Sequence, residues 1–163
     1  MELLAKIVLL GVLAVLLWQD LKERQVWWFL LPLFAIAGSY LFFVNVSPVL
    51  YATSLLWNLA IVGVLLATLY AYARWKLKKE FLAETFGLAD LLFFIAFALS
   101  MPTFAFLNFF VAALVFSLLS YLALRMVFRS KQQTVPLAGM MSLFLIAVYS
   151  AHWMGYFETL YLF

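Results

Sequence analysis

The chain has 163 residues, of which 69% are hydrophobic and 10% are charged, and its formal net charge at pH 7 is +3. A soluble domain carries roughly 45–50% apolar and about 25% charged residues, so this composition predicts an integral membrane protein. The absence of cysteine excludes disulfides and thiolate metal sites, and with His152 as the single histidine we expect no metal and no cofactor. The charge is small and forms no basic stripe among polar residues, which argues against nucleic acid as a partner.

Clusters of charge divide the chain into apolar segments of about the 20 residues that a membrane-spanning helix needs. The first segment follows Glu2 and lacks the positive start of a signal peptide, so we interpret it as a retained span. The apolar stretch from Phe86 to Leu124 would make a single helix about 60 Å long, twice the hydrocarbon thickness. Pro102 lies near its middle and predicts a turn. The predicted spans are therefore Leu3–Trp18, Val26–Val44, Val49–Ala73, 87–101, 103–124 and Val135–Trp153.

An even number of spans places both termini on one side of the membrane. The Lys and Arg residues follow the first, third and fifth spans, and only Lys6 falls on the other side. Because basic loops stay in the cytoplasm, we predict extracytoplasmic termini. The sequence thus predicts an all-α protein of the cytoplasmic (inner) membrane, with about six transmembrane helices in a single polytopic domain over residues 1–163. The predicted aromatic belt at the cytoplasmic interface consists of Trp18, Trp27, Trp28 and Trp75.

The chain contains two aspartates, Asp20 at the end of the first predicted span and Asp90 at the start of the fourth. The predicted topology puts both at the cytoplasmic boundary. Asp90 is followed directly by LLFFIAFAL. An ionisable group inside a span costs on the order of 3 kcal/mol, so an intramembrane carboxylate is a candidate for function. A structural alternative is open for Asp20, which could cap a helix or pair with Lys22 or Arg24.

A pair of carboxylates on neighbouring helices suggests one class of reaction. If the two groups approach closely, they share one proton. The ionised member can then activate water as a general base, and the protonated member can donate to a peptide carbonyl as it becomes tetrahedral. The two aspartates therefore point to aspartyl proteolysis.

Three motifs carry a family resemblance. The four residues Gly87-Leu88-Ala89-Asp90 are similar to a GxGD motif with alanine at the second glycine, Asp20–Val26 is similar to a D-x-x-x-R-x-I segment, and Val135–Gly139 is similar to an I-P-F-G-P segment. In this order and spacing they resemble type IV prepilin peptidases and preflagellin peptidases, which are membrane aspartyl proteases. The resemblance implies metal-free chemistry with Asp20 and Asp90 as the catalytic pair. The residues that it implies as shaping the active site are Arg24, Gly87, Ala89, Pro136 and Gly139.

The resemblance also implies a substrate, namely a membrane-anchored prepilin-like protein whose leader peptide is cut at the cytoplasmic face of the bilayer. The chain is similar to the short, peptidase-only branch, because it lacks the methyltransferase domain and cysteine cluster of larger members. It departs from the family at Trp27-Trp28, where Pro-Asn is usual, and at Leu92, where Lys is common. These departures leave both acids intact and bear on substrate preference and activity.

Two other functions stay open at this point. A family member that has lost catalysis would act as a membrane-bound binding or assembly factor, and the altered motif positions favour that reading. A small transporter would use the buried acids to relay protons or to bind cations. It would predict more polar residues along the span interiors than the few scattered Asn, Ser and Thr residues that the sequence contains.

Overall fold

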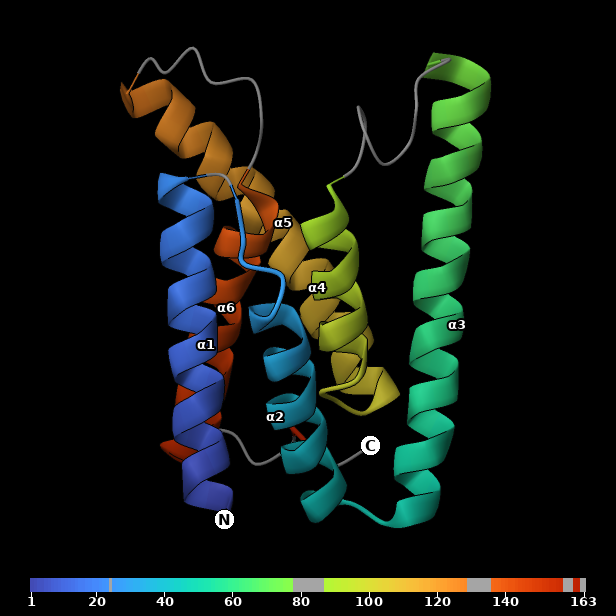
Figure 1. Ribbon diagram of the computed structural model, residues 1–163, viewed down its shortest axis with the longest axis vertical. Coiled ribbons are helices and arrows are strands. Elements are labelled where there is room, and N and C mark those ends of the chain that lie inside the picture. Colours follow the sequence, from blue (N-terminus) through green and yellow to red (C-terminus); the bar gives the residue numbers. More distant parts are fainter. Residues whose placement is uncertain (24, 78–86, 129–135, 157–159, 162–163) are drawn as a thin grey trace.

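The chain forms a bundle of helices that run alternately up and down (Figure 1). The computed structural model describes residues 1–23, 25–77, 87–128, 136–156 and 160–161, and these ranges contain six α-helices and no β-strand. The Met1 end of α1 and the Trp153 end of α6 lie at the same end of the bundle (Figure 1). The helices are α1 (Glu2–Lys22), α2 (Leu30–Asn45), α3 (Pro48–Tyr72), its π-helical continuation η1 (Ala73–Leu77), α4 (Leu88–Ala98), α5 (Thr103–Phe128) and α6 (Leu137–Trp153).

The predicted all-α architecture is confirmed, and each predicted span contains one α-helix. Three helical stretches are long and apolar enough to cross a membrane, namely Glu2–Lys22, Pro48–Trp75 and Thr103–Ala123. The remaining helices α2, α4 and α6 are shorter and apolar. The turn predicted at Pro102 is present, because α4 ends at Ala98 and α5 begins at Thr103.

Two of the helix boundaries that differ from the prediction flank the connection between α1 and α2. Helix α1 continues to Lys22, so Asp20 lies within its last turn and not beyond its end. Helix α2 begins at Leu30 instead of Val26. The residues before Leu30 are not helical, and the Trp27 N–H donates to the side chain of Gln19 on α1. A hydrophobicity pattern does not reveal this bond, because Val26–Phe29 is as apolar as the helix that follows it.

Side-chain hydrogen bonds fix the ends of α3 and α4. Ser47 caps α3 by accepting the Leu50 N–H at 3.3 Å, and Pro48 follows as the first helical residue, where its missing N–H leaves no bond unmade. Asn58, fully buried on α3, donates to the carbonyls of Ala98 and Met101 at 2.8 and 2.9 Å. Asn58 therefore satisfies carbonyls at the turn that reverses the chain between α4 and α5.

The apolar core lies where α1 packs against α2 and α6, α4 packs against α2, and α5 packs against α6. Its centre is a set of ring contacts among Phe93, Phe97, Phe106 and Phe110. Gly38 lets α2 approach the turn between α4 and α5, because a Cβ at that position would lie 2.6 Å from the Ser100 Cβ. Helix α3 stands at the edge of the bundle (Figure 1), and its buried side chains are Ser54, Asn58 and Val62.

Candidate active site

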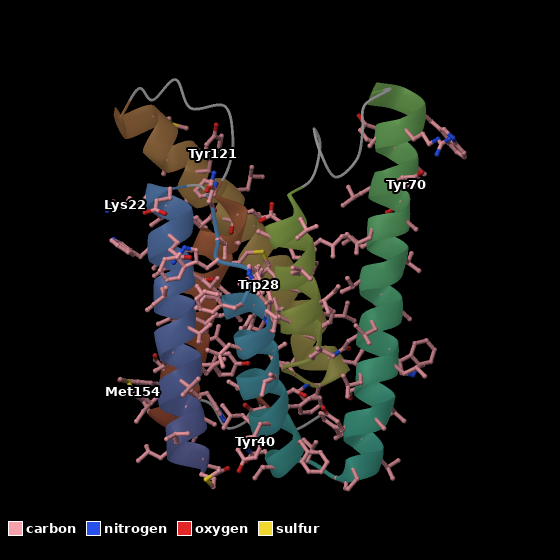
Figure 2. All side chains as sticks on the ribbon, viewed as in Figure 1. Lys22, Trp28, Tyr40, Tyr70, Tyr121 and Met154 are labelled. Carbon is pink, nitrogen blue, oxygen red and sulfur yellow. The ribbon has the colours of Figure 1, made fainter. Side chains whose placement is uncertain are left out.

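The two aspartates meet at the first turn of α6. Asp20 lies in the last turn of α1, and Asp90 lies in the first turn of α4. The helices α4 and α6 both begin at the end of the bundle where α1 ends (Figure 1), and Figure 2 labels Lys22 there, with Met154 and Tyr40 at the opposite end. The carboxyl groups are close enough to interact electrostatically. The structure thus brings together two residues that are 70 positions apart in the chain.

The first turn of α6 contacts both acids. The Gly139 N–H donates to Asp20 Oδ2 at 2.6 Å, and the Ala138 backbone lies near enough to the Asp90 carboxyl group to interact with it. Amides in the first turn of a helix have no partner within the helix, and the positive end of the helix dipole favours negative charge there. Pro136 occupies the N-cap position of α6 and supplies no side-chain cap. Asp20, from another helix, therefore satisfies one of the amides that α6 leaves unpaired.

Two glycines leave room for the carboxyl groups. A Cβ at position 139 would lie 3.0 Å from both the Cβ and the Oδ2 of Asp20, which is closer than nearly all observed contacts of a Cβ. A Cβ at position 87 would lie 3.2 Å from Asp90 Oδ2. Each aspartate therefore packs against a position that only glycine fills without displacing the acid.

The acids differ in exposure to the surroundings. Asp20 is 9% exposed, and Asp90 is half-buried in the first turn of α4. Gly87, the N-cap of α4, is exposed beside Asp90. The site is therefore closed on the side of α1 and α6 and more open on the side where α4 begins.

The other residues that the sequence indicated are distributed around this pair. Pro136 is buried and precedes the first turn of α6. Ala89 is half-buried in the first turn of α4 and packs against the core. Arg24 lies outside the described residues. The structure thus places Pro136, Gly139, Gly87 and Ala89 on the two helix starts that carry the acid contacts.

Two participants were not predicted from the sequence. Ala138 contributes only its backbone N–H, and no pattern of side chains could have indicated that contribution. Gln19 precedes Asp20 in the chain, is 2% exposed, and accepts the Trp27 N–H through its Oε1 at 3.1 Å. A buried amide in the last turn of an otherwise apolar helix was the available signal for Gln19, since buried polar groups normally serve a hydrogen bond.

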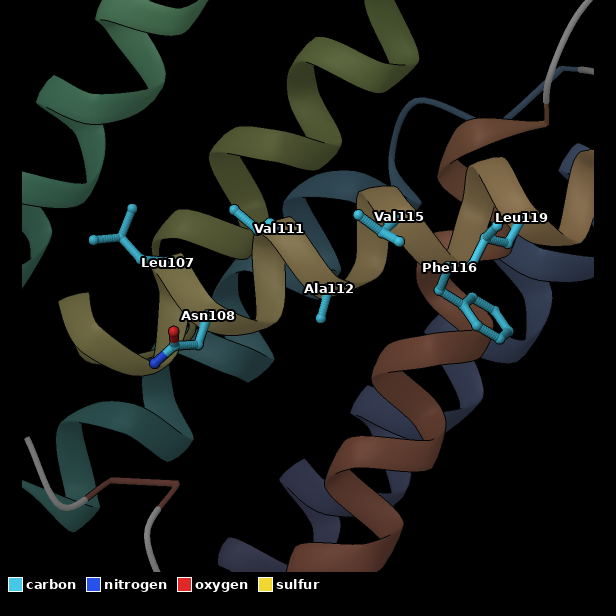
Figure 3. A pocket seen from close by; sticks show the side chains of 7 residues that line it. All are labelled: Leu107, Asn108, Val111, Ala112, Val115, Phe116 and Leu119. Carbon is cyan, nitrogen blue, oxygen red and sulfur yellow. The ribbon is translucent and has the colours of Figure 1, made fainter.

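The site is built from carboxylates and backbone amides. Among the described residues, no group of three His, Cys, Asp or Glu side chains could hold a metal ion. A shallow groove elsewhere runs along α5 (Figure 3) and is lined by Leu107, Asn108, Val111, Ala112, Val115, Phe116 and Leu119. The groove is mostly apolar and contains neither aspartate, so it is not part of the acid site.

Comparison of the chain with models of protein families, with curated proteins and with solved structures finds no match. The functional argument therefore depends on the residues and their geometry. These define a helical bundle, with several helices able to cross a membrane, that holds an aspartate pair at one end.

Proposed function

We propose that the chain is a membrane aspartyl endopeptidase that cleaves the leader peptide of a membrane-anchored, prepilin-like substrate at the cytoplasmic face. The observation that carries the proposal is the convergence of Asp20 and Asp90 at the first turn of α6. These are the only two aspartates of the chain. Their meeting at a helix start, beside glycines that make room for them, supports a shared chemical role.

The mechanism follows from the shared proton. In the resting state the pair holds one proton between two carboxyl groups. The ionised carboxylate takes a proton from a water molecule, and the water oxygen attacks the peptide carbonyl carbon. The protonated carboxyl group donates its proton to the carbonyl oxygen, which yields a neutral tetrahedral intermediate. Collapse of the intermediate breaks the C–N bond: the nitrogen takes the proton of the pair, and a hydroxyl group of the intermediate gives its proton to the pair as the carbonyl re-forms. One water is consumed, and the pair again holds a single proton.

The amides of α6 contribute by orienting the acids. A carboxyl group that accepts a backbone N–H is fixed in position, and preorganised groups lose little of their effectiveness to reorganisation during the reaction. The Gly139 N–H fixes Asp20 in this way through its bond to Oδ2.

The placement of the site supports a substrate that is itself embedded in the bilayer. The acids lie at one end of apolar helices. A substrate with an apolar helix in the membrane and a short leader outside it presents its junction at that depth. In the proposed orientation the acid end is the cytoplasmic end, because Lys22 in the last turn of α1 and Arg74 in η1 lie where these helices end, at that end of the bundle.

Replacement of each aspartate by asparagine tests this function. The Asn carboxamide oxygen still accepts an amide N–H, so the contacts with α6 persist, but the group no longer exchanges a proton at neutral pH. We expect Asp20→Asn and Asp90→Asn each to lower cleavage of a co-expressed prepilin-like substrate by about a hundredfold or more. Product size on a gel and mass spectrometry of the new terminus measure the cleavage.

Glu2→Gln is the matched control, because it removes an exposed carboxylate at the opposite end of α1. It should leave cleavage at the wild-type level. Cleavage that survives both aspartate substitutions contradicts the proposed mechanism.

A second candidate is a noncatalytic binding or assembly factor of the same architecture. One observation favours it: Pro136 gives α6 no side-chain cap, and Asp20 supplies an acceptor for the Gly139 N–H. In that case the aspartates serve as structural caps, for which Asn is about as good as Asp. Asp→Asn variants would then retain every function of the protein, whereas Asp20→Ala would destabilise it.

A further inference from the structure

The connection between α1 and α2 lies beside the last turns of α1. Trp27 is within hydrogen-bond distance of Gln19, which precedes the end of α1 at Lys22, so the chain doubles back along the helix it has just left. Figure 1 shows the start of α2 well inside the bundle, and in Figure 2 Trp28 lies between the level of Lys22 and that of Met154 and Tyr40. The non-helical residues Val26–Phe29, named here the α1–α2 wall, therefore lie at the depth of the helices.

Non-helical backbone at this depth needs partners within the protein, because lipid offers none. The Trp27 N–H donates to Gln19 Oε1, and the Trp27 carbonyl accepts the Leu30 N–H at 3.1 Å. Val26 packs against the core. The bond to Gln19 joins this backbone to α1, and the buried position of Gln19 protects it from competition with solvent.

The wall presents aromatic side chains to the exterior. Trp27 is 56% exposed and Trp28 is 73% exposed, and Phe29 stacks on Trp27 with ring centroids 5.6 Å apart. Aromatic side chains of this kind supply large and rigid contact area. Gln19 thus connects two features: its side chain holds the aromatic wall, and its backbone continues directly into Asp20.

We propose that Gln19 is a positioning residue for substrate binding, which acts by holding the α1–α2 wall against the helix that carries Asp20. The inference rests on the proposed function. The bound substrate contacts the aromatic side chains of the wall with its apolar helix, while its leader junction reaches the acids. Gln19 itself takes no part in proton transfer, so its loss affects binding of the substrate and leaves the chemical step in place.

Steady-state cleavage by Gln19→Met tests the inference, because methionine has a similar size but offers no comparable acceptor to the Trp27 N–H. We expect KM to rise about fivefold, which corresponds to one hydrogen bond of ordinary strength, with kcat within a factor of two of the wild type. Asn108→Met is the matched control, since it makes the same kind of change at an exposed position on α5 and should leave both constants unchanged.

A double-mutant cycle separates this role from general support of the fold. If Gln19 acts through the wall, Trp27→Ala raises KM as well, and Gln19→Met adds little in the Trp27→Ala background. An unchanged KM in Trp27→Ala overturns the inference even if Gln19→Met does not fold. Independent, additive effects of the two substitutions on KM overturn it too.

Failure of the inference and failure of the proposed function give different results. If the wild type cleaves in a manner that depends on Asp20 and Asp90, while KM of Gln19→Met is unchanged, the inference alone is wrong. If no cleavage depends on the aspartates, both are wrong.

Discussion

Position 139 is where a single methyl group would disturb the acid site most directly. A Cβ there would meet Asp20 at 3.0 Å, and the residue cannot yield without shifting the carboxyl group that the Gly139 N–H holds. We expect Gly139→Ala to lower cleavage at least about tenfold, because small displacements of a catalytic group are costly to rate. Initial rates with a prepilin-like substrate measure the effect.

Gly11→Ala is the control for this prediction, because nothing lies within 4 Å of a Cβ at position 11 of the same helix that carries Asp20. It should leave the rate unchanged. Equal rates for Gly139→Ala and the wild type would show that the tight packing against Asp20 has no part in activity.

At the residue scale, the sequence predicted which side chains belong to the site better than it predicted the groups that they contact. Asp20 and Asp90 could be singled out because they are the only aspartates in an apolar chain, and burial of charge is costly. Their partners could not. Every residue except proline has a backbone N–H. Only the three-dimensional arrangement of α1, α4 and α6 places those of Ala138 and Gly139 beside the acids.

At the scale of elements, the turn between α4 and α5 depends on Asn58. Its amide donates to two carbonyls, that of Ala98 at the end of α4 and that of Met101 in the turn before α5. We expect Asn58→Leu to lower the free energy of unfolding by about 2 kcal/mol, because buried polar groups then lack partners. Thermal unfolding in detergent, followed by circular dichroism, measures the change.

Asn108→Leu is the comparison for this prediction, since Asn108 is an exposed amide on α5 (Figure 3). Its replacement should change the unfolding temperature little. If the Asn58→Leu protein is as stable as the wild type, the prediction is wrong, and water or a rearranged turn satisfies the two carbonyls.

The helices themselves were largely predictable, and their ends were less so. The long apolar stretches and Pro102 indicated six helices and the reversal between α4 and α5. The start of α2 was predicted wrongly at Val26, because hydropathy measures the preference for lipid and not the backbone conformation. Trp27 in this non-helical stretch bonds through its backbone N–H to Gln19 on α1, a contact between two elements that hydropathy does not reveal.

For the whole molecule, the central prediction concerns the orientation of the helical bundle in the membrane. Helices of alternating direction place Glu23, after α1, and Met154, after α6, at opposite ends of the bundle. If the basic residues that follow α1 and α3 stay in the cytoplasm, the Glu23 end is cytoplasmic and the aspartates face that compartment. The substrate leader must then be available in the cytoplasm for cleavage to occur.

The absence of cysteine makes this orientation directly measurable, because any thiol introduced is the only one present. Glu23 and Met154 are both exposed, so Glu23→Cys and Met154→Cys should be accessible to a membrane-impermeant maleimide. We expect Glu23→Cys to react only in inverted vesicles and Met154→Cys only in right-side-out vesicles, with complete labelling of both after detergent is added. The reverse pattern would put the aspartates on the outer face, where a cytoplasmic leader could not reach them. Labelling of both positions from one side would contradict the crossing of the membrane by an odd number of spans between them.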